Sequence, residues 1–489
     1  MLGEMQLAAL IGTDSLPLPD MGATEILGLT ADSRAVKPGY LFAALPGTKL
    51  DGTAFIAQAI EQGAAALLVP QGATVEARVP VISDRNPRRR LALMAARFFG
   101  AQPATIAAVT GTNGKTSVAT FTQQFWTMLG EEAASLGTLG VSSAKGERPL
   151  GFTTPDPVSL QAELAVLAGE GVTHLAMEAS SHGLAQYRLD GVKLCAAGFT
   201  NITRDHMDYH TSFEDYLYAK LRLFGEVMGP GGIAVINADS PQYAEFEAVS
   251  WARGHRVISV GRNGRDIRIV AARPDARGQT LELSYEDTSY NVKLPLVGEF
   301  QASNALVAAG LVIGCGAEAA KVFAALERLT GARGRMEVAV HLPSGASVYI
   351  DYAHTPDALE NVLEAMRPHT KGRLAVVFGC GGDRDPGKRV LMGEVAARLA
   401  DQVYVTDDNP RSENPALIRA AILKGCPGAR EIADRAEAIE AAMQALGAGD
   451  VLVVAGKGHE TGQIIGSETI PFSDHEAVRA AASKMGGAA

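Results

Sequence analysis

One short segment, Thr110-Gly111-Thr112-Asn113-Gly114-Lys115-Thr116, constrains the fold of this chain more than any other. It follows an apolar run at 105–109 that is typical of a buried strand, and it precedes an amphipathic helical pattern. A loop in this position presents backbone N–H groups and a lysine to phosphates, so we expect a nucleotide site built from Gly111, Thr112, Asn113, Gly114, Lys115, Thr116 and Ser117. Lys115 would contact the β- and γ-phosphates, and Thr116 would ligate Mg²⁺. Val109 stands where the pattern GxxxxGK[ST] has its first glycine, and the alternative interpretation is a glycine-rich turn without a ligand.

The length of the chain and the order of its apolar runs indicate several domains. At 489 residues it exceeds what one hydrophobic core usually organises. From residue 103, buried strands alternate with helical segments, the pattern of a largely parallel sheet covered on both faces, and the pattern starts again near residue 335. Polar residues directly follow these strands, where open α/β sheets hold their ligands. We therefore predict three α/β domains, at 1–102, 103–335 and 336–489.

Charge and cysteine content narrow the partners and the compartment. A formal net charge of -10 argues against a broad nucleic-acid-binding surface but leaves room for local basic pockets. The four cysteines show no CxxC pairing, so neither a disulfide framework nor a zinc site is indicated. Glu4 replaces the basic residues of a signal peptide, and no apolar stretch approaches the length of a membrane span. We expect a cytoplasmic monomer that binds neither nucleic acid nor membrane.

Three motifs carry a resemblance to a known family. The loop at 110–116 resembles the ATP-binding loop of the Mur ligases and of their folylpolyglutamate synthase relatives. The segments MEASSH at 177–182 and NITRDHMD at 201–208 each follow a predicted strand and resemble further Mur ligase motifs. The resemblance implies an α/β fold with the three-domain Mur ligase architecture, in which the central domain is a P-loop mononucleotide-binding domain and the C-terminal domain is Rossmann-like. It covers nearly the whole chain, with the motifs in the family's order.

The same resemblance implies a metal site. Glu178 and His206 would be Mg²⁺ ligands, a carboxylate and an imidazole that hold a second ion between ATP and the acceptor carboxylate. Lys220 is similar to the family lysine that CO₂ converts to N6-carboxylysine, which turns a cation into a carboxylate-like ligand. With Lys115, these residues form the implied catalytic set. Taken alone, Glu178 and His206 would be structural side chains and Lys220 a solvated helix lysine.

Three residues extend the implied ATP site. Asn304 is similar to the family asparagine that contacts adenine, and Arg335 to its phosphate-binding arginine. Asp351 matches the nucleotide-facing start of the third domain. The alternative is a purely structural role, in which Asn304 is a helix cap and Asp351 is a turn residue.

The phosphate-binding loop and the implied metal ligands suit the formation of an amide bond. A carboxylate does not react with an amine in neutral water until it is activated, and ATP can convert it to an acyl phosphate. The reaction needs a phosphate cradle, a divalent metal to neutralise crowded anions, and a second site that presents a neutral amine. The motifs supply the first two parts, so the third is expected from the C-terminal domain.

The segment Asp408-Asn409-Pro410-Arg411 is the sharpest indication of which amine is used. It resembles the motif of the diaminopimelate-adding Mur ligases, and Arg411 can pair bidentately with the distal carboxylate that meso-2,6-diaminopimelate has and lysine lacks. By resemblance the pocket is completed by Arg384, Gly456 and Glu460, with Glu460 holding the distal ammonium. As a local pattern, 408–411 is a turn after a strand.

Two further groups resemble the site for a UDP-linked acceptor. In the first domain, the implied uridine and pyrophosphate contacts are Ser33, Thr48, Lys49 and Leu50. In the central domain, the implied muramoyl-peptide contacts are Thr153, Thr154, Ser180, Gln186 and Arg188. Phe152 stands where the family usually has asparagine, which leaves one polar contact unmatched. For the N-terminal group the alternative is ordinary surface polarity.

Together the resemblances imply ATP- and Mg²⁺-dependent addition of meso-2,6-diaminopimelate to the D-Glu of UDP-MurNAc-L-Ala-D-Glu, a step of peptidoglycan precursor synthesis. A lysine-adding Mur ligase and a folylpolyglutamate synthase are the near alternatives, and the segments at 32–34 and 408–411 argue against them. A P-loop NTPase that couples hydrolysis to regulation or transport would explain only the loop at 110–116. An inactive binding homologue is disfavoured, because every residue expected to bind metal or phosphate is present.

Overall fold

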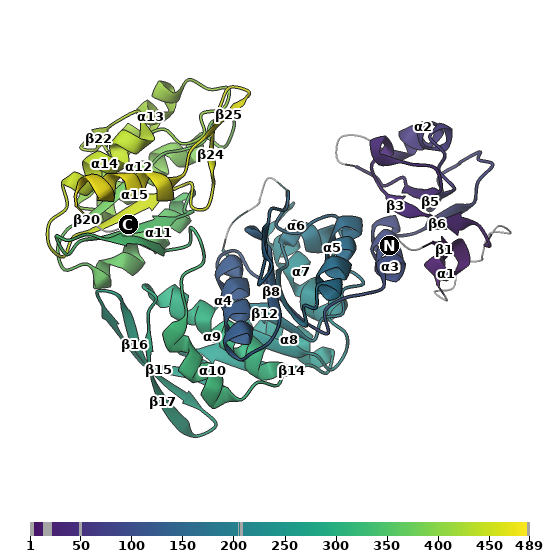
Figure 1. Ribbon diagram of the computed structural model, residues 1–489, viewed down its shortest axis with the longest axis horizontal. Coiled ribbons are helices and arrows are strands. Elements are labelled where there is room, and N and C mark those ends of the chain that lie inside the picture. The colour runs from purple at the N-terminus through teal and green to yellow at the C-terminus, as the bar shows by residue number, and fades with distance from the viewer. Residues whose placement is uncertain (1–3, 13–21, 48–50, 204, 206–208, 487–489) are drawn as a thin grey trace. The chain divides into compact units, whose positions relative to one another are not determined.

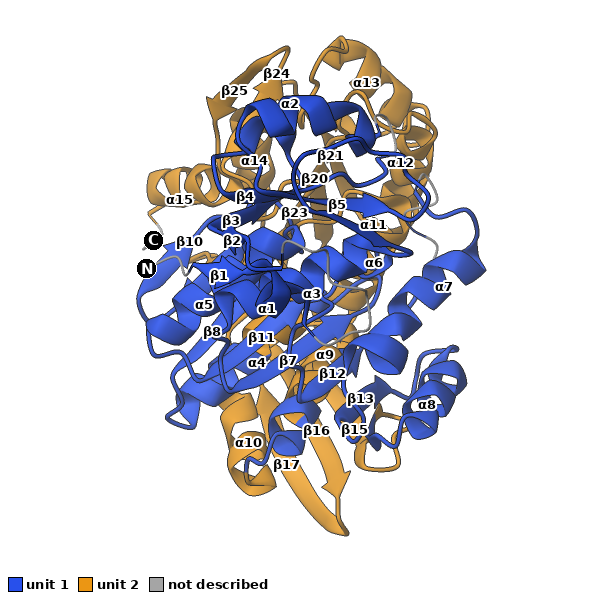
Figure 2. Cartoon of the chain, turned by 90° about the vertical axis from the view of Figure 1, so that its right-hand side faces the viewer, with its two compact units in different colours: residues 1–115, 122–259, 310–317 blue, residues 116–121, 260–309, 318–489 orange. Residues whose placement is uncertain are grey.

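The structure of the protein is a computed structural model that describes residues 4–12, 22–47, 51–203, 205 and 209–486. Figure 1 shows the course of the chain, and Figure 2 colours its two compact units. The first unit comprises residues 1–115, 122–259 and 310–317, and the second comprises 116–121, 260–309 and 318–489. Thr48, Lys49, Leu50 and His206, which the sequence singled out, lie outside the described residues.

The N-terminal region, purple in Figure 1, contains a parallel sheet with the strand order β3-β4-β5-β6 and a short antiparallel pair, β1 and β2. Its strands are β1 (Met5–Gln6), β2 (Glu25–Ile26), β3 (Gly28–Thr30), β4 (Tyr40–Ala43), β5 (Ala66–Pro70) and β6 (Val81–Asp84). Its helices are α1 (Leu7–Ile11), η1 (Ser33–Ala35), η2 (Gly52–Phe55), α2 (Ile56–Glu61) and α3 (Pro87–Phe99). Helix α3 begins where the Asn86 side chain accepts the N–H of Arg89 at 3.0 Å, and it buries Leu91, Met94 and Phe98.

The central sheet has the strand order β10-β9-β8-β11-β7-β12-β13-β14-β15-β16-β17. Its strands are β7 (Thr105–Thr110), β8 (Ala133–Gly137), β9 (Gly140–Ser143), β10 (Gly146–Arg148), β11 (His174–Glu178), β12 (Ala196–Phe199), β13 (Ile233–Asn237), β14 (Arg256–Gly261), β15 (Ile267–Asp275), β16 (Gly278–Tyr285) and β17 (Thr288–Leu294). The accompanying helices are α4 (Lys115–Met128), α5 (Pro157–Gly169), α6 (Ser181–Ala185), α7 (Phe213–Arg222), η3 (Leu223–Val227), α8 (Tyr243–Ala252), α9 (Glu299–Gly314), α10 (Ala319–Ala325) and η4 (Leu326–Arg328).

The direction of the central strands positions the candidate site. Strands β8, β11, β7, β12 and β13 run parallel, as the sequence predicts, and β15 pairs parallel to β14. Strands β9, β10, β16 and β17 are added by antiparallel pairing. Because the carboxyl ends of parallel strands meet at one edge, the segments that follow β7, β11 and β12 converge there. Gly111 and Thr200 directly follow β7 and β12, and Glu178 is the last residue of β11.

The C-terminal region is organised around a sheet with the strand order β18-β19-β23-β20-β21-β22. Its strands, with the hairpin β24–β25, are β18 (Glu337–His341), β19 (Ser347–Asp351), β20 (Leu374–Phe378), β21 (Gln402–Val405), β22 (Arg430–Glu431), β23 (Val451–Ala455), β24 (Gly462–Ile465) and β25 (Glu468–Pro471). Its helices are α11 (Pro356–Met366), η5 (Arg367–His369), α12 (Gly387–Leu399), α13 (Pro415–Leu423), α14 (Arg435–Gln444) and α15 (Asp474–Lys484).

Both faces of this C-terminal sheet are covered, as the sequence predicts. Val376 and its neighbour Val377 on β20 point to opposite faces because side chains alternate along a strand. Val376 packs in a cluster with Leu363 of α11, and Val377 packs in a different cluster with Met443 of α14. Among the described residues, no helix is both long enough and apolar enough to cross a membrane.

Candidate functional site

The loop after β7 forms the strand, loop and helix arrangement that the sequence predicts. A Cβ atom at Gly111 would collide with Thr200 Oγ1, so only glycine lets the loop pass this close to the end of β12. Gly114, with φ of 88°, turns the chain into α4. Lys115 folds back over the loop, because its Nζ donates to the carbonyls of Gly111 at 2.9 Å and Thr112 at 2.7 Å. Thr116 and Ser117 follow on α4 and are buried.

Hydrogen bonds from neighbouring segments fix the shape of this loop. The N–H groups of Thr112 and Asn113 donate to the backbone carbonyl and side-chain oxygen of Asn201, at 2.8 and 3.0 Å. Thr112 Oγ1 lies 3.0 Å from the hydroxyl of Tyr216 on α7. The segment after β12 and helix α7 therefore preorganise the loop.

Lys220 is the most unusual side chain near this loop. It lies one turn beyond Tyr216 on α7 and is only 1% exposed, which rules out the interpretation as a solvated helix lysine. Its Nζ donates to the carbonyl of Gly111 at 2.8 Å and lies 4.4 Å from the centroid of the Tyr216 ring. Burial and then the charge of Lys115 lower the pKa of Lys220 far below its ordinary value, against the opposing charge of Asp205. The amine is therefore readily neutral, the form in which a lysine reacts with CO₂.

Glu178 ends β11 as a buried carboxylate. Its Oε1 accepts the N–H of Thr138 at 2.7 Å, and its Oε2 accepts the Thr138 hydroxyl at 3.2 Å. The same hydroxyl lies 3.0 Å from that of Thr153. Thr138 thus connects Glu178 to the predicted peptide contacts, and no sequence motif identified it. Within the described ranges, no group of three or more His, Cys, Asp and Glu side chains is arranged to hold a metal.

The residues predicted to contact the muramoyl peptide lie together; they are Thr153, Thr154, Ser180, Gln186 and Arg188. Arg188 donates to the carbonyl of Thr154 at 2.6 Å and to the side chain of Gln186 at 2.8 Å. The Ser180 hydroxyl donates to Thr154 Oγ1 at 3.0 Å and accepts the N–H of Gly183, which caps α6. These contacts form one connected polar network at the ends of β11 and the loop before α5.

Phe152 is not part of this polar network, and 67% of its surface is exposed to solvent. The guanidinium carbon of Arg188 lies 5.7 Å from the centroid of its ring. A cation over an aromatic face therefore stands where the family's usual asparagine would offer a polar contact.

A hollow of about 620 Å³ joins this network to the N-terminal region. Its lining includes Gln186 and Arg188 together with Asp32, Lys37 and Arg88, and Ser33 lies between the lining residues Asp32 and Ala35. Lys37 and Arg88 were not predicted as site residues, although Arg88 belongs to a basic run that the sequence displays at 85–90. Three basic side chains, Lys37, Arg88 and Arg188, outnumber the two acidic ones in the lining, Asp32 and Asp156, which suits an anionic ligand such as a pyrophosphate.

The remaining ATP-site candidates lie in the second unit and are linked to one another through neighbouring residues. Asn304 on α9 donates to the side chain of Gln301 at 3.1 Å, and Gln301 donates to the carbonyl of Arg335 at 3.1 Å. The guanidinium of Arg335 lies over the ring of Tyr352, 4.5 Å from its centroid. Asp351 accepts two backbone N–H groups at 2.7 Å each. Burial raises the pKa of Asp351, against the nearby charge of Arg335.

Arg411 is held in a backbone conformation that side chains rarely adopt, with φ of 50°. The strain is supported by β24 and its turn, because the N–H of Arg411 donates to Ile464 at 3.0 Å and its carbonyl accepts from Gly466 at 2.7 Å. Its Nη1 donates to the carbonyl of Gly382 at 2.7 Å. Arg384 lies two residues beyond Gly382 in the same loop and is exposed. The fold thus fixes the position from which the Arg411 side chain extends.

Beside Arg411, a buried lysine that the sequence did not single out organises the other predicted residues. Lys457 Nζ donates to Asn409 Oδ1 and to Glu460 Oε2, both at 3.0 Å, and Asn409 donates to the same Glu460 oxygen at 3.0 Å. A Cβ atom at Gly456 would lie 2.7 Å from a carboxylate oxygen of Asp408, so glycine lets these two segments touch. Pro410 is buried between Asn409 and Arg411. Six of the seven predicted amino-acid contacts, all but Arg384, therefore come from the segments 408–411 and 456–460, and Arg384 lies on an adjoining loop.

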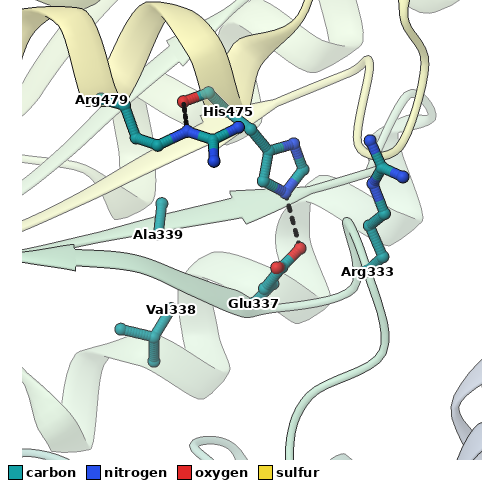
Figure 3. A pocket seen from close by; sticks show the side chains of 6 residues that line it. All are labelled: Arg333, Glu337, Val338, Ala339, His475 and Arg479. Carbon is teal, nitrogen blue, oxygen red and sulfur yellow. Dashed lines mark hydrogen bonds and ion pairs between the residues drawn. The ribbon is translucent and has the colours of Figure 1, made fainter. Parts of the chain in front are cut away.

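A separate hollow of about 350 Å³ in the second unit is lined by Arg333, Glu337, Val338, Ala339, His475 and Arg479 (Figure 3). His475 Nε2 lies 2.6 Å from Glu337 Oε2 and connects α15 to the start of β18. Burial alone would raise the pKa of Glu337, but the hydrogen bonds from His475 and the Gly334 N–H, with the charge of Arg333, outweigh it. The pKa therefore lies below its ordinary value of 4.5.

The substitution Glu337→Gln is expected to cost about 1 kcal/mol of unfolding free energy at neutral pH. A carboxyl group whose pKa is lower in the folded chain stabilises the fold above its unfolded pKa, and this stability is lost as the pH falls through the folded pKa. Urea unfolding of both proteins should show a difference at pH 7 that shrinks below pH 4.5. The exposed Glu364→Gln is the control. A difference that stays constant across the whole pH range would contradict the assignment.

Comparison with known proteins gives the same family along the whole chain. Residues 25–99 match the model of the Mur ligase family, catalytic domain, residues 109–312 match the Mur ligase middle domain, and residues 334–458 match the Mur ligase, glutamate ligase domain. A relative from Bradyrhizobium diazoefficiens, named UDP-N-acetylmuramoyl-L-alanyl-D-glutamate--2,6-diaminopimelate ligase, is 57% identical over 98% of this chain and 99% of its own.

Solved structures agree with this result and with the predicted fold class. A structure of UDP-N-acetylmuramoyl-L-alanyl-D-glutamate--2,6-diaminopimelate ligase is 32% identical, covers 99% of this chain and 100% of its own, and has a TM-score of 0.76. The MurF ligase from Thermotoga maritima, solved in complex with ADP, shares the fold at 18% identity, with a TM-score of 0.61 over 94% of this chain and 97% of its own. The α/β fold and the resemblance predicted from the motifs are confirmed, and the chain belongs to the Mur ligase family.

Proposed function

We propose that this protein is an ATP-dependent ligase that joins meso-2,6-diaminopimelate to the D-Glu of UDP-MurNAc-L-Ala-D-Glu through an acyl phosphate. The observation that carries the choice of amine is the cluster of Asn409, Lys457 and Glu460, to which the backbone of Arg411 is connected through Ile464. An arginine and a carboxylate from these connected segments suit the distal carboxylate and ammonium of diaminopimelate, whereas lysine would leave the guanidinium unpaired. Relatives that carry this activity in their names support the same choice.

The proposed division of the chain is 1–102 for the UDP-linked substrate, 103–335 for ATP and 336–489 for the amino acid. In the first, Ser33, Thr48, Lys49 and Leu50 bind uridine and pyrophosphate. In the second, Thr153, Thr154, Ser180, Gln186 and Arg188 bind the muramoyl peptide and present its carboxylate. The basic hollow that Lys37 and Arg88 line supports this placement.

For ATP, the loop Gly111 to Ser117 surrounds the phosphates, with Lys115 on the β- and γ-phosphates. Asn304 contacts adenine, Arg335 binds phosphate, and Asp351 lies at the nucleotide-facing start of the last region. The two carbonyls that accept from Lys115 belong to the loop itself, which places the amine at the loop. Phosphoryl transfer depends mainly on such positioning and charge neutralisation.

The metal is proposed to be Mg²⁺. Thr116 and Glu178 are buried oxygen donors, the ligand type that Mg²⁺ prefers, and His206 and Lys220 as its carbamate complete the set. Mg²⁺ at this place would neutralise the crowded anions of ATP and the acceptor carboxylate. The readily neutral amine of buried Lys220 supports its carbamylation. We further propose that the enzyme is a cytoplasmic monomer.

In the proposed reaction, this chain contributes positions and charges. Arg188 and its partners hold the acceptor so that its carboxylate faces the γ-phosphate. Glu460 and Arg411 hold diaminopimelate by its distal end, which leaves the other amine free to attack the acyl carbon. Release of phosphate then accompanies formation of the amide.

Phosphate release distinguishes this proposal from a P-loop NTPase. With ATP and Mg²⁺, we expect release only when UDP-MurNAc-L-Ala-D-Glu and meso-diaminopimelate are both present, with one phosphate for each amide formed. The variant Lys115→Ala should lose this release while it still folds, as its melting curve would show. Sustained phosphate release with ATP alone, at a rate that neither substrate changes, would favour the NTPase and sink the proposal.

A further inference from the structure

Two of the four cysteines touch, although 120 residues separate them in the sequence. The Sγ atoms of Cys195 and Cys315 lie 3.1 Å apart, closer than two sulfur atoms in ordinary contact. Cys195 directly precedes β12 and Cys315 directly follows α9, and both are half-buried. The other two, Cys380 and Cys426, are buried, at 3% and 1% exposure.

The fold holds this pair together through backbone contacts. The N–H of Cys195 donates to Ile106 on β7 and its carbonyl accepts from Ile233 on β13, both at 3.0 Å, so Cys195 is fixed within the sheet. A Cβ atom at Gly314 would collide with the side chain of Ile233. Glycine therefore lets the end of α9 pack closely against β13, the strand whose Ile233 N–H bonds to Cys195. Cys315 is the next residue, and Gly316, with φ of 106°, ends the helix there.

The two thiols differ in the direction of their pKa shifts, and Cys195 lies at a hollow. The hydrogen bond from the Cys315 thiol lowers the pKa of Cys195, even though burial opposes this. The same hydrogen bond and burial raise the pKa of Cys315. Cys195 is half-buried and is one of the residues that line a hollow of about 480 Å³. By contrast, burial raises the pKa of Cys380 and Cys426 to about 12 and about 11.

We propose that Cys195 and Cys315 form a reversible oxidation site, at which a low-molecular-weight disulfide such as oxidised glutathione converts the two thiols to a disulfide. The Cys195 thiolate attacks one sulfur of the glutathione disulfide, and the expelled glutathione takes up the proton that Cys195 lost. The Cys315 sulfur, having released its proton to water, attacks Cys195 Sγ and expels the second glutathione. Two protein thiols are oxidised while one disulfide is reduced to two thiols.

This disulfide would fasten α9 to the amino end of β12. The loop after β7 lies at the opposite, carboxyl end of the strands, so oxidation is expected to leave ligation largely unchanged. Closing a chain segment of 120 residues restricts the unfolded chain, which raises the melting temperature, by about 2 °C or more.

The test is to incubate the reduced full-length chain with excess oxidised glutathione, block free thiols, and map the peptides by mass spectrometry. We expect two of four thiols to disappear, a peptide joining Cys195 to Cys315, a higher melting temperature, and full reversal by dithiothreitol. The variant Cys315→Ser should instead stop with one glutathione on Cys195, and Cys380→Ser should behave as the wild type. Four intact thiols, a stable glutathione adduct on the wild type, or a bond between two chains would each overturn the proposal.

Discussion

Replacing Lys220 by alanine is expected to lower kcat for amide formation by about 10²–10⁴-fold. A metal ligand at the phosphoryl-transfer site contributes several kcal/mol to the transition state, and each ~1.4 kcal/mol is a factor of ten in rate. Because a lysine buried to 1% exposure is costly to desolvate, its removal should not weaken the fold. The measurement is kcat at saturating substrates, with the melting temperature beside it.

Two matched variants separate a carbamate from a plain cation. Lys220→Arg keeps a positive charge but cannot be carbamylated, so it should lose as much activity as Lys220→Ala, and acetate should partly restore the alanine variant by supplying a carboxylate. The exposed Lys193→Ala is the control and should remain active. Full activity in Lys220→Arg would show that charge alone is needed and would refute the carbamate.

The substitution Arg411→Ala is expected to reduce kcat/KM for meso-diaminopimelate by about 10²–10³-fold, because truncating one partner of a desolvated charge pair costs about 3–4 kcal/mol. Any reaction with L-lysine, which has no distal carboxylate, should change little. The preference for diaminopimelate over lysine should therefore collapse in this variant.

The variant Arg411→Lys tests the geometry of the same contact. Lysine keeps the positive charge but lacks the planar guanidinium, which the backbone at φ of 50° positions for a bidentate contact. Most of the loss in kcat/KM for diaminopimelate should therefore remain. Arg398→Ala, a surface arginine paired with Glu360, is the control. An equal loss with both amines would mean that Arg411 supports the fold or another substrate rather than the distal carboxylate.

Apolar runs predicted most of the sheet framework correctly. The strands before Gly111, Glu178 and Thr200 were identified because each is a short buried run followed by polar residues. The antiparallel hairpins β8–β10 and β15–β17 were not resolved, since a run of alternating residues does not reveal the direction of its neighbour.

Site residues that belong to a sequence motif were predicted. Contacts that form only when distant segments pack together were missed. The position of Lys220 in its helix predicts a surface lysine. Its burial depends on packing against Tyr216 and on the carbonyl of Gly111 in the loop after β7, which meet it only in the folded chain. Thr138 lies far from Glu178 in sequence, and the contact of Cys195 with Cys315 arises only when α9 meets the sheet. Such contacts are set by packing between distant segments, which local patterns do not encode.

One competition assay tests the central claim most directly. The enzyme is given ATP, Mg²⁺ and UDP-MurNAc-L-Ala-D-Glu with equal amounts of meso-diaminopimelate and L-lysine, and the nucleotide products are identified by mass. The account predicts that essentially all of the amide product carries diaminopimelate. A product that carries mainly lysine would contradict the role of Arg411 and Glu460, and phosphate release without any amide product would contradict ligation itself.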